Sequence, residues 1–171
     1  MSKIEFKIFS QNGEDGVINF ILTRMKLKKV NSLEIGCDPL ENNTIYNCLI
    51  KNRNKFNVFV EMSIEKCLLL KFLSKTFFCN NLDVVNKKIT EKNINKFVLR
   101  KFKKEDIDLF SIDVDGLDYY ILRRINFFPK IIILEYNKYF QTNPITIINN
   151  PKFKWGGGWK RREEIFIGVQ A

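Results

Sequence analysis

The segment DLFSIDVDGLDYYILRR, Asp108–Arg124, decides the fold class of this chain. It starts as an apolar run, passes through three carboxylates and a glycine, and ends in a stretch with helical spacing. Such a run, closed by polar residues before a helix, is typical of a buried strand in an α/β sheet. The carboxylates Asp113, Asp115 and Asp118 are therefore expected at the edge of that sheet.

The same alternation extends along the chain. Apolar runs that predict strands are Ser32–Gly36, Asn57–Met62, Leu82–Val85, Asp108–Val114 and Lys130–Tyr136. Segments with helical spacing are Glu14–Met25, Asn43–Lys51, Ile64–Phe77, Glu91–Phe102 and Leu117–Ile125. Alternating strands and helices predict an α/β fold with a mainly parallel sheet, in which ligands bind at the carboxyl ends of the strands. In the first helix we expect Val17, Phe20 and Ile21 to share one face.

The chain has 171 residues, which suits a single domain. We expect an N-terminal helical extension over residues 1–30, a core over 31–137 and an irregular tail over 138–171. No apolar stretch approaches the length of a membrane span and no signal peptide is evident, so a cytoplasmic protein is expected.

The formal net charge is +10, which favours an anionic partner. Compact basic clusters occur only at 100–104 (RKFKK) and 160–162 (KRR), so nucleic acid is a partner that the sequence allows but does not favour. The chain contains no histidine, and its four cysteines lack CxxC spacing, which argues against a zinc site of the usual kind. Asp, Glu, Lys or Tyr are left for proton transfer.

Polar residues follow the first three predicted strands. Gly36 permits a tight turn, and Glu34 and Asp38 beside it are acceptors for amines or hydroxyls. Glu61 ends the second strand, where an acid commonly accepts hydrogen bonds from ribose hydroxyls; the alternative is that Glu61 or Ser63 caps the next helix. Asn86, after the third strand, is a positional candidate for the rim of an adenine pocket.

The fourth and fifth strands bring a second polar set to this edge. Asp113 and Asp115 are spaced i, i+2, as are Glu135 and Asn137, so each pair is expected on one side of its strand. Four converging oxygen-bearing side chains suit a divalent cation such as Mg²⁺ or Mn²⁺, or a base that takes a proton from a hydroxyl. The alternative is that Asp115 caps the following helix and Asp118 stabilises its first turn.

Four motifs in order, FSQNGEDGVINFIL, LEIGCDPLENNT, DLFSIDVDGLDYYIL and IIILEYN, resemble the FkbM-like branch of class I S-adenosylmethionine-dependent methyltransferases, in particular members that open with S-Q-x-G-E-D. The resemblance implies a Rossmann-like three-layer sandwich with sheet order 3-2-1-4-5 and methyl transfer to a hydroxyl, often on a sugar or small metabolite. Since 34 residues follow Asn137 (171 − 137), it also implies reduced or missing C-terminal strands, which a homo-oligomer would compensate.

The resemblance also assigns roles. Glu34, Gly36 and Asp38 match the first cofactor loop and Asn43 the polar residue behind it, while Glu61 matches the ribose-binding acid. Asp113 matches the acid near the methionine part of the cofactor. Gln11, Glu14 and Asp15 match the opening motif, which is expected to close over the site.

Two other functions stay open at this level. One is a methyltransferase-like binding module without turnover. The other is a nucleic-acid-binding or nucleic-acid-modifying protein, suggested by the charge and by Trp155, Trp159 and KRR near the C-terminus.

Overall fold

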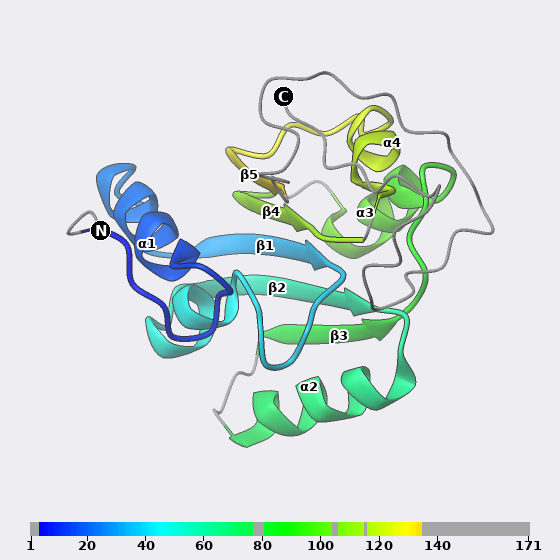
Figure 1. Cartoon of the computed structure of the whole chain (residues 1–171). Helices are drawn as coiled ribbons and strands as arrows, with labels where there is room; N and C mark the ends of the chain where they lie inside the picture. The colour runs from blue at the N-terminus through cyan, green and yellow to red at the C-terminus, as the bar shows by residue number, and fades with distance from the viewer. Residues whose placement is uncertain (1–3, 77–80, 104–105, 115, 135–171) are drawn as a thin grey trace, which may run out of the picture.

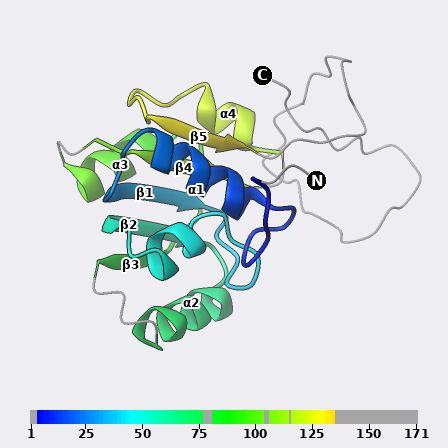
Figure 2. The same cartoon turned by 90° about the vertical axis from the view of Figure 1, so that its left-hand side faces the viewer.

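A computed structural model describes residues 4–76, 81–103, 106–114 and 116–134 (Figure 1). Its centre is a sheet of five parallel strands, β1 (Val30–Ile35), β2 (Asn54–Glu61), β3 (Leu82–Asn86), β4 (Leu109–Ile112) and β5 (Ile131–Leu134). The strand order is β3-β2-β1-β4-β5, which confirms the predicted topology. Figure 2 shows this order across the sheet, with α1 passing in front of it.

The central strand explains why the sequence pattern is so apolar. All six residues of β1 are buried, because β2 and β4 flank it and helices cover both of its faces. Neighbouring strands align Glu34 with Phe59 on one side and with Ser111 on the other. Glu34 therefore lies in the interior, one residue before the end of β1.

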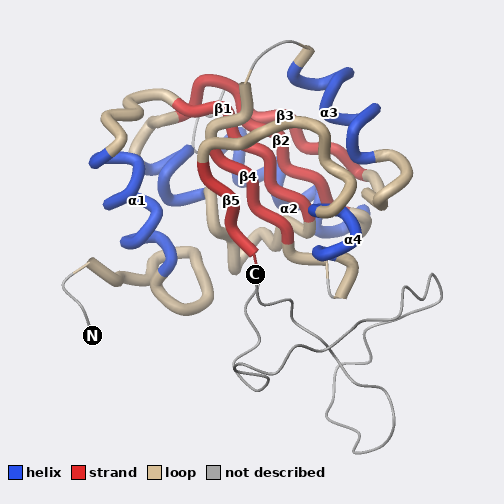
Figure 3. Tube along the Cα trace, turned by 90° about the horizontal axis from the view of Figure 1, so that it is seen from above, coloured by secondary structure: helices blue, strands red, loops and turns tan. Residues whose placement is uncertain are grey.

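Two helical layers complete a three-layer sandwich (Figure 3). One face of the sheet packs against α3 (Ile94–Phe102) and α4 (Asp118–Leu122). The other carries α1 (Glu14–Arg24), the short π-type helix η1 (Tyr46–Ile50) and α2 (Ile64–Thr76). Among the described residues, no helix is both long and apolar enough to cross a bilayer.

The buried side of α1 is not the face that Val17, Phe20 and Ile21 were predicted to share. Ile18 and Leu22 are buried against the sheet, whereas Val17 and Phe20 are 37% and 44% exposed. The helix carries apolar residues around most of its circumference, so periodicity alone did not single out the buried side.

Three helices are shorter than predicted. The segment predicted as Asn43–Lys51 becomes helical only at Tyr46, because the preceding residues form hydrogen-bonded turns. In α3 the first turn is displaced to Ile94, since the Asn93 side chain accepts a hydrogen bond from the Thr90 amide. The predicted helix from Leu117 to Ile125 contracts to α4.

The amino edge of the sheet is tied together by one carboxylate. Asp108, 6% exposed, accepts a 2.8 Å hydrogen bond from the Asn31 amide and forms a 2.5 Å ion pair with Lys130. These contacts join the beginnings of β1, β4 and β5. The predicted tail and any strands after β5 lie outside the described residues.

Candidate functional site

The carboxyl ends of β1 and β4 meet at a glycine. Gly36 has φ +81°, and a Cβ at this position would lie 1.5 Å from the carbonyl oxygen of Asp113. The Asp113 amide in turn donates to the carbonyl of Ile35 at 2.9 Å. Only glycine allows the backbone to turn this tightly against the neighbouring strand. The predicted turn is therefore present, and its steric reason is the contact between two strand ends.

Glu34 forms the inner support of the loop that follows. Its carboxylate accepts hydrogen bonds from the Asn43 amide at 3.1 Å and from the Thr44 hydroxyl. The Asn43 side chain also donates to the hydroxyl of Ser111 on β4 at 3.2 Å. Burial raises the pKa of Glu34 to about 7, because these neutral donors only partly compensate for the loss of water.

Asp38 shapes the outer turn of the same loop. Its carboxylate accepts hydrogen bonds from the amides of Leu40 (2.8 Å) and Glu41 (3.2 Å), and it forms a 2.8 Å ion pair with Lys66 of α2. Burial raises the pKa of Asp38, but the Lys66 ammonium and the two amides outweigh this effect, so the pKa lies below its usual value. The ion pair with Lys66 therefore connects this loop to α2.

Asn42 is a residue that the sequence reasoning missed. It is 2% exposed; its oxygen accepts hydrogen bonds from the amides of Thr44 (2.8 Å) and Ile45 (2.7 Å), and its amide nitrogen lies 2.6 Å from the Cys37 sulfur. Burial, together with the charge of Glu34, raises the pKa of Cys37 well above its usual value, so this thiol stays protonated. The signal that could have identified Asn42 is its place between Pro39 and η1, because asparagine side chains in turns commonly bond the following backbone amides.

Glu61 ends β2 on the same edge. One carboxylate oxygen accepts a 2.7 Å hydrogen bond from the Ser63 amide, and its second oxygen makes no hydrogen bond within the described residues. Ser63 caps α2 through the Lys66 amide at 3.3 Å. Asn86 lies beside Glu61 and donates to the carbonyls of Glu61 (3.1 Å) and Met62 (2.8 Å). Ser63 therefore caps the helix, and Glu61 keeps one oxygen without a hydrogen-bond partner among the described residues.

Asp113 is exposed at the end of β4. Asp118 accepts hydrogen bonds from the amides of Val114 (3.0 Å) and Gly116 (3.2 Å), so it holds the turn that leads into α4. Asp115, Glu135 and Asn137 lie outside the described residues. Within the part of the chain that the structure describes, no three acidic, cysteine or histidine residues are grouped as a metal site.

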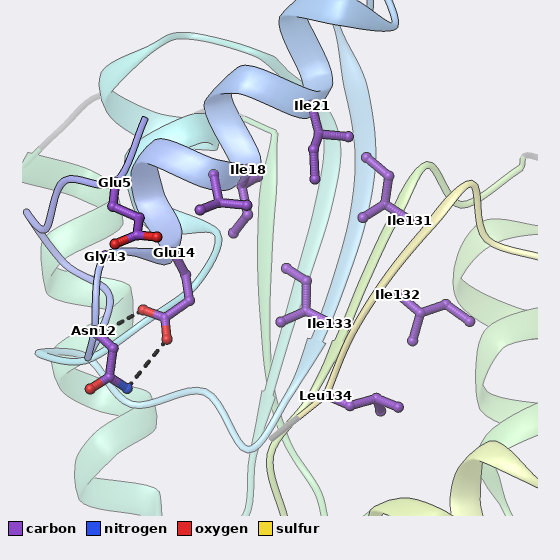
Figure 4. Close-up of a pocket in the computed structure, with 11 residues that line it drawn as sticks. Glu5, Asn12, Gly13, Glu14, Ile18, Ile21, Ile131, Ile132, Ile133 and Leu134 are labelled. Carbon is purple, nitrogen blue, oxygen red and sulfur yellow. Dashed lines mark hydrogen bonds between the residues drawn. The ribbon is translucent and has the colours of Figure 1, made fainter. Parts of the chain in front are cut away.

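The opening motif lies between this loop and a groove. Asp15 is buried, Gln11 is exposed, and Glu14 accepts hydrogen bonds from the amide and side chain of Asn12 at 2.7 and 3.3 Å. The groove has a volume of about 410 Å³ and separates α1 from β5. Figure 4 shows isoleucines of both elements along its length and Glu5, Asn12 and Glu14 at one end.

Solved structures similar to this model share little sequence with the chain. A coclaurine N-methyltransferase bound to N-methylheliamine and SAH has 14% identity and a TM-score of 0.40, over 64% of this chain and 30% of that one. MtNAS in complex with MTA and tNA has 12% identity and a TM-score of 0.47, over 66% and 40%. A SAM-dependent methyltransferase from Thiobacillus denitrificans, in complex with S-adenosyl-L-homocysteine, has 8% identity and a TM-score of 0.43, over 72% and 47%. The chain spans less than half the length of each of these proteins.

A search of curated protein sequences gives no match. The family model for the methyltransferase FkbM domain matches residues 7–148, which is most of the chain. The match includes the opening motif, all five strands and the loop between Gly36 and Thr44. The chain therefore belongs to the FkbM methyltransferase family.

Proposed function

We propose that this protein transfers a methyl group from S-adenosylmethionine to a hydroxyl of a small acceptor, such as a sugar. The observation that carries the proposal is the arrangement at the carboxyl edge of β1, β2 and β4, within a chain of the FkbM methyltransferase family. There Gly36 abuts Asp113, and Glu61 ends the adjacent strand. We also propose that residues 1–171 form one domain, since α1 packs on the same sheet.

The residues at this edge fit such a cofactor. The second oxygen of Glu61, which no described residue hydrogen bonds, would accept the ribose hydroxyls, while the Ser63 amide fixes the first oxygen. The backbone around Gly36 would run beside the methionine part, and Asn86 would border the base. Glu34 has its carboxylate occupied by Asn43 and Thr44, so we assign it to the support of the loop.

The bound cofactor would supply a methyl group already activated on a sulfonium. The chain must then align the acceptor oxygen with that methyl group and remove the hydroxyl proton. We assign proton removal to the Asp113 carboxylate, with Asp115 as the second candidate base. Glu135 and Asn137 are further candidates for holding the acceptor hydroxyl. A divalent cation held by Asp113, Asp115 and Glu135 is the alternative means of lowering the pKa of the acceptor hydroxyl.

The test is transfer of a radiolabelled methyl group to a panel of sugars and other hydroxylated metabolites. Asp113→Asn should lower the turnover by about two orders of magnitude on an acceptor that the wild type methylates. Asp83→Asn is the matched control, because Asp83 lies on β3 and pairs with Lys101. Full activity of Asp113→Asn would rule out the assigned role.

Two results would separate the alternatives. Loss of activity on chelation, restored by Mg²⁺ or Mn²⁺, would favour the cation over the lone base. Binding of S-adenosylhomocysteine without methylation of any acceptor in the panel would favour a binding module.

A further inference from the structure

The opening motif contains a buried carboxylate that accepts several backbone hydrogen bonds. Asp15 has no exposed surface, and a single oxygen accepts hydrogen bonds from three successive amides, those of Ile8 (2.7 Å), Phe9 (2.7 Å) and Ser10 (3.0 Å). The Asp15 amide donates back to the Ser10 hydroxyl at 3.0 Å. Asp15 therefore fixes residues 8–10 through its carboxylate and through its backbone amide.

This backbone contacts the loop after β1 directly. The carbonyl of Phe9 accepts a 2.9 Å hydrogen bond from the Asn42 amide. The Phe9 ring also packs against the apolar cluster that contains Cys37 and Ile45, the residues that bracket Asn42. Residues 8–10 thus hold both the backbone and the apolar side of the loop.

From Asn42 the contacts lead to the strand end. The Asn42 side chain fixes the amides of Thr44 and Ile45, and the Thr44 hydroxyl donates to Glu34. An uninterrupted series of hydrogen bonds therefore runs from Asp15 through Phe9 and Asn42 to the end of β1. Such a series couples the two ends only if each group keeps its partner.

The energetically unfavourable burial of Asp15 also indicates a role in fixing this segment. Its second oxygen is buried and accepts no hydrogen bond within the described residues, which disfavours a carboxylate in the interior. Gly16 beside it is required as well, because a Cβ there would lie 2.0 Å from the carbonyl oxygen of Ile4. The motif thus combines a buried carboxylate that lacks one hydrogen-bond partner among the described residues with a close approach between the backbone at Ile4 and the first turn of α1.

We propose that Asp15 is a positioning residue for the cofactor-binding loop: it fixes residues 8–10, which hold Asn42 and through it the loop from Cys37 to Ile45. The inference rests on the proposed function, since it takes this loop to be the one that binds S-adenosylmethionine. Residue 15 itself would touch neither cofactor nor acceptor.

The test compares two buried carboxylates. Asp15→Asn weakens the acceptor for three amides. Asp108→Asn is the matched control, because Asp108 is also buried and accepts a hydrogen bond from a backbone amide at the opposite edge of the sheet. Hydrogen exchange is measured by mass spectrometry on peptides that cover residues 40–47. The dissociation constant of S-adenosylhomocysteine is measured by calorimetry.

We expect Asp15→Asn to accelerate exchange in these peptides and to raise the dissociation constant about tenfold. Asp108→Asn should lower the melting temperature but leave both quantities unchanged. If folded Asp15→Asn matches the wild type in exchange and affinity, the inference is wrong. If Asp15→Asn does not fold, Ser10→Ala, which removes one contact, must show the same changes at smaller size; wild-type values for that variant would overturn the inference.

Failure of the proposed function gives a different result. A wild-type protein that does not bind S-adenosylhomocysteine contradicts the cofactor assignment, whereas the exchange data still decide whether Asp15 fixes the loop.

Discussion

The two edges of the sheet each contain a buried carboxylate, and they satisfy it differently. At the amino edge Asp108 is paired with the Lys130 ammonium and the Asn31 amide. At the carboxyl edge Glu34, 3% exposed, accepts hydrogen bonds from the neutral donors of Asn43 and Thr44. The first arrangement joins three strands by charge. The second holds a loop through a carboxylate whose pKa is close to neutral pH.

The largest expected difference comes from the contact between β1 and β4. Gly36→Ala should destabilise the protein by more than about 4 kcal/mol, because its Cβ would overlap the carbonyl of Asp113 at 1.5 Å. Gly116→Ala is the control: Gly116 also has positive φ, +84°, but a Cβ there would meet nothing within 4 Å. Only backbone strain of about 1 kcal/mol is expected for it. Urea unfolding measures both, and equal losses would show that the carboxyl edge is not close-packed.

The next effect is the pH dependence that Glu34 confers. Its pKa is raised from 4.5 to about 7 in the folded protein, so the folded state binds a proton more tightly than the unfolded state. Glu34 should therefore make the free energy of unfolding fall as the pH rises from about 4.5 to 7, by roughly 3 kcal/mol in total, and then level off.

Glu34→Gln isolates this contribution. The variant should lose that fall between pH 4.5 and 7 and be at least as stable as the wild type at pH 8, since an amide can bond Asn43 and Thr44 without a buried charge. Parallel pH profiles for Glu34→Gln and the wild type would contradict the raised pKa.

The smallest effect concerns the charged pair at the amino edge. Lys130→Met should cost about 1 kcal/mol, because Asp108 is only 6% exposed and would keep a buried charge without its cation. Lys101→Met removes an equally short pair with Asp83, but both partners are about a third exposed, so its cost should stay within about 0.5 kcal/mol. Thermal unfolding at low salt compares the two. A larger loss for Lys101→Met would reverse the assignment.

The strands could be predicted from the sequence because each apolar run is short and continuous, whereas their order was implied by the family resemblance. In β1 every residue is buried, so no alternation was needed to identify it. The buried face of α1 could not be predicted, since Ile18 and Leu22 have the same helical spacing as neighbouring apolar residues that remain exposed.

The candidate site was predictable only as a location. The sequence indicated Gly36, Glu61 and Asp113 because each follows a strand, and parallel strands end at one edge. It did not indicate that Glu34 supports the loop, because that role depends on where Asn42 turns the chain. Asp15 was recognised from the motif, but its partners are amides, which leave no mark in the sequence.

The central claim is that the carboxyl edge of the sheet binds S-adenosylmethionine. Calorimetric titration of S-adenosylhomocysteine into the wild type and into Glu61→Gln tests it most directly. We predict micromolar binding by the wild type and binding at least about tenfold weaker by the variant, because the amide replaces an acceptor for the ribose hydroxyls. No binding by the wild type at about 1 mM ligand, or equal affinity for the two proteins, would contradict the claim.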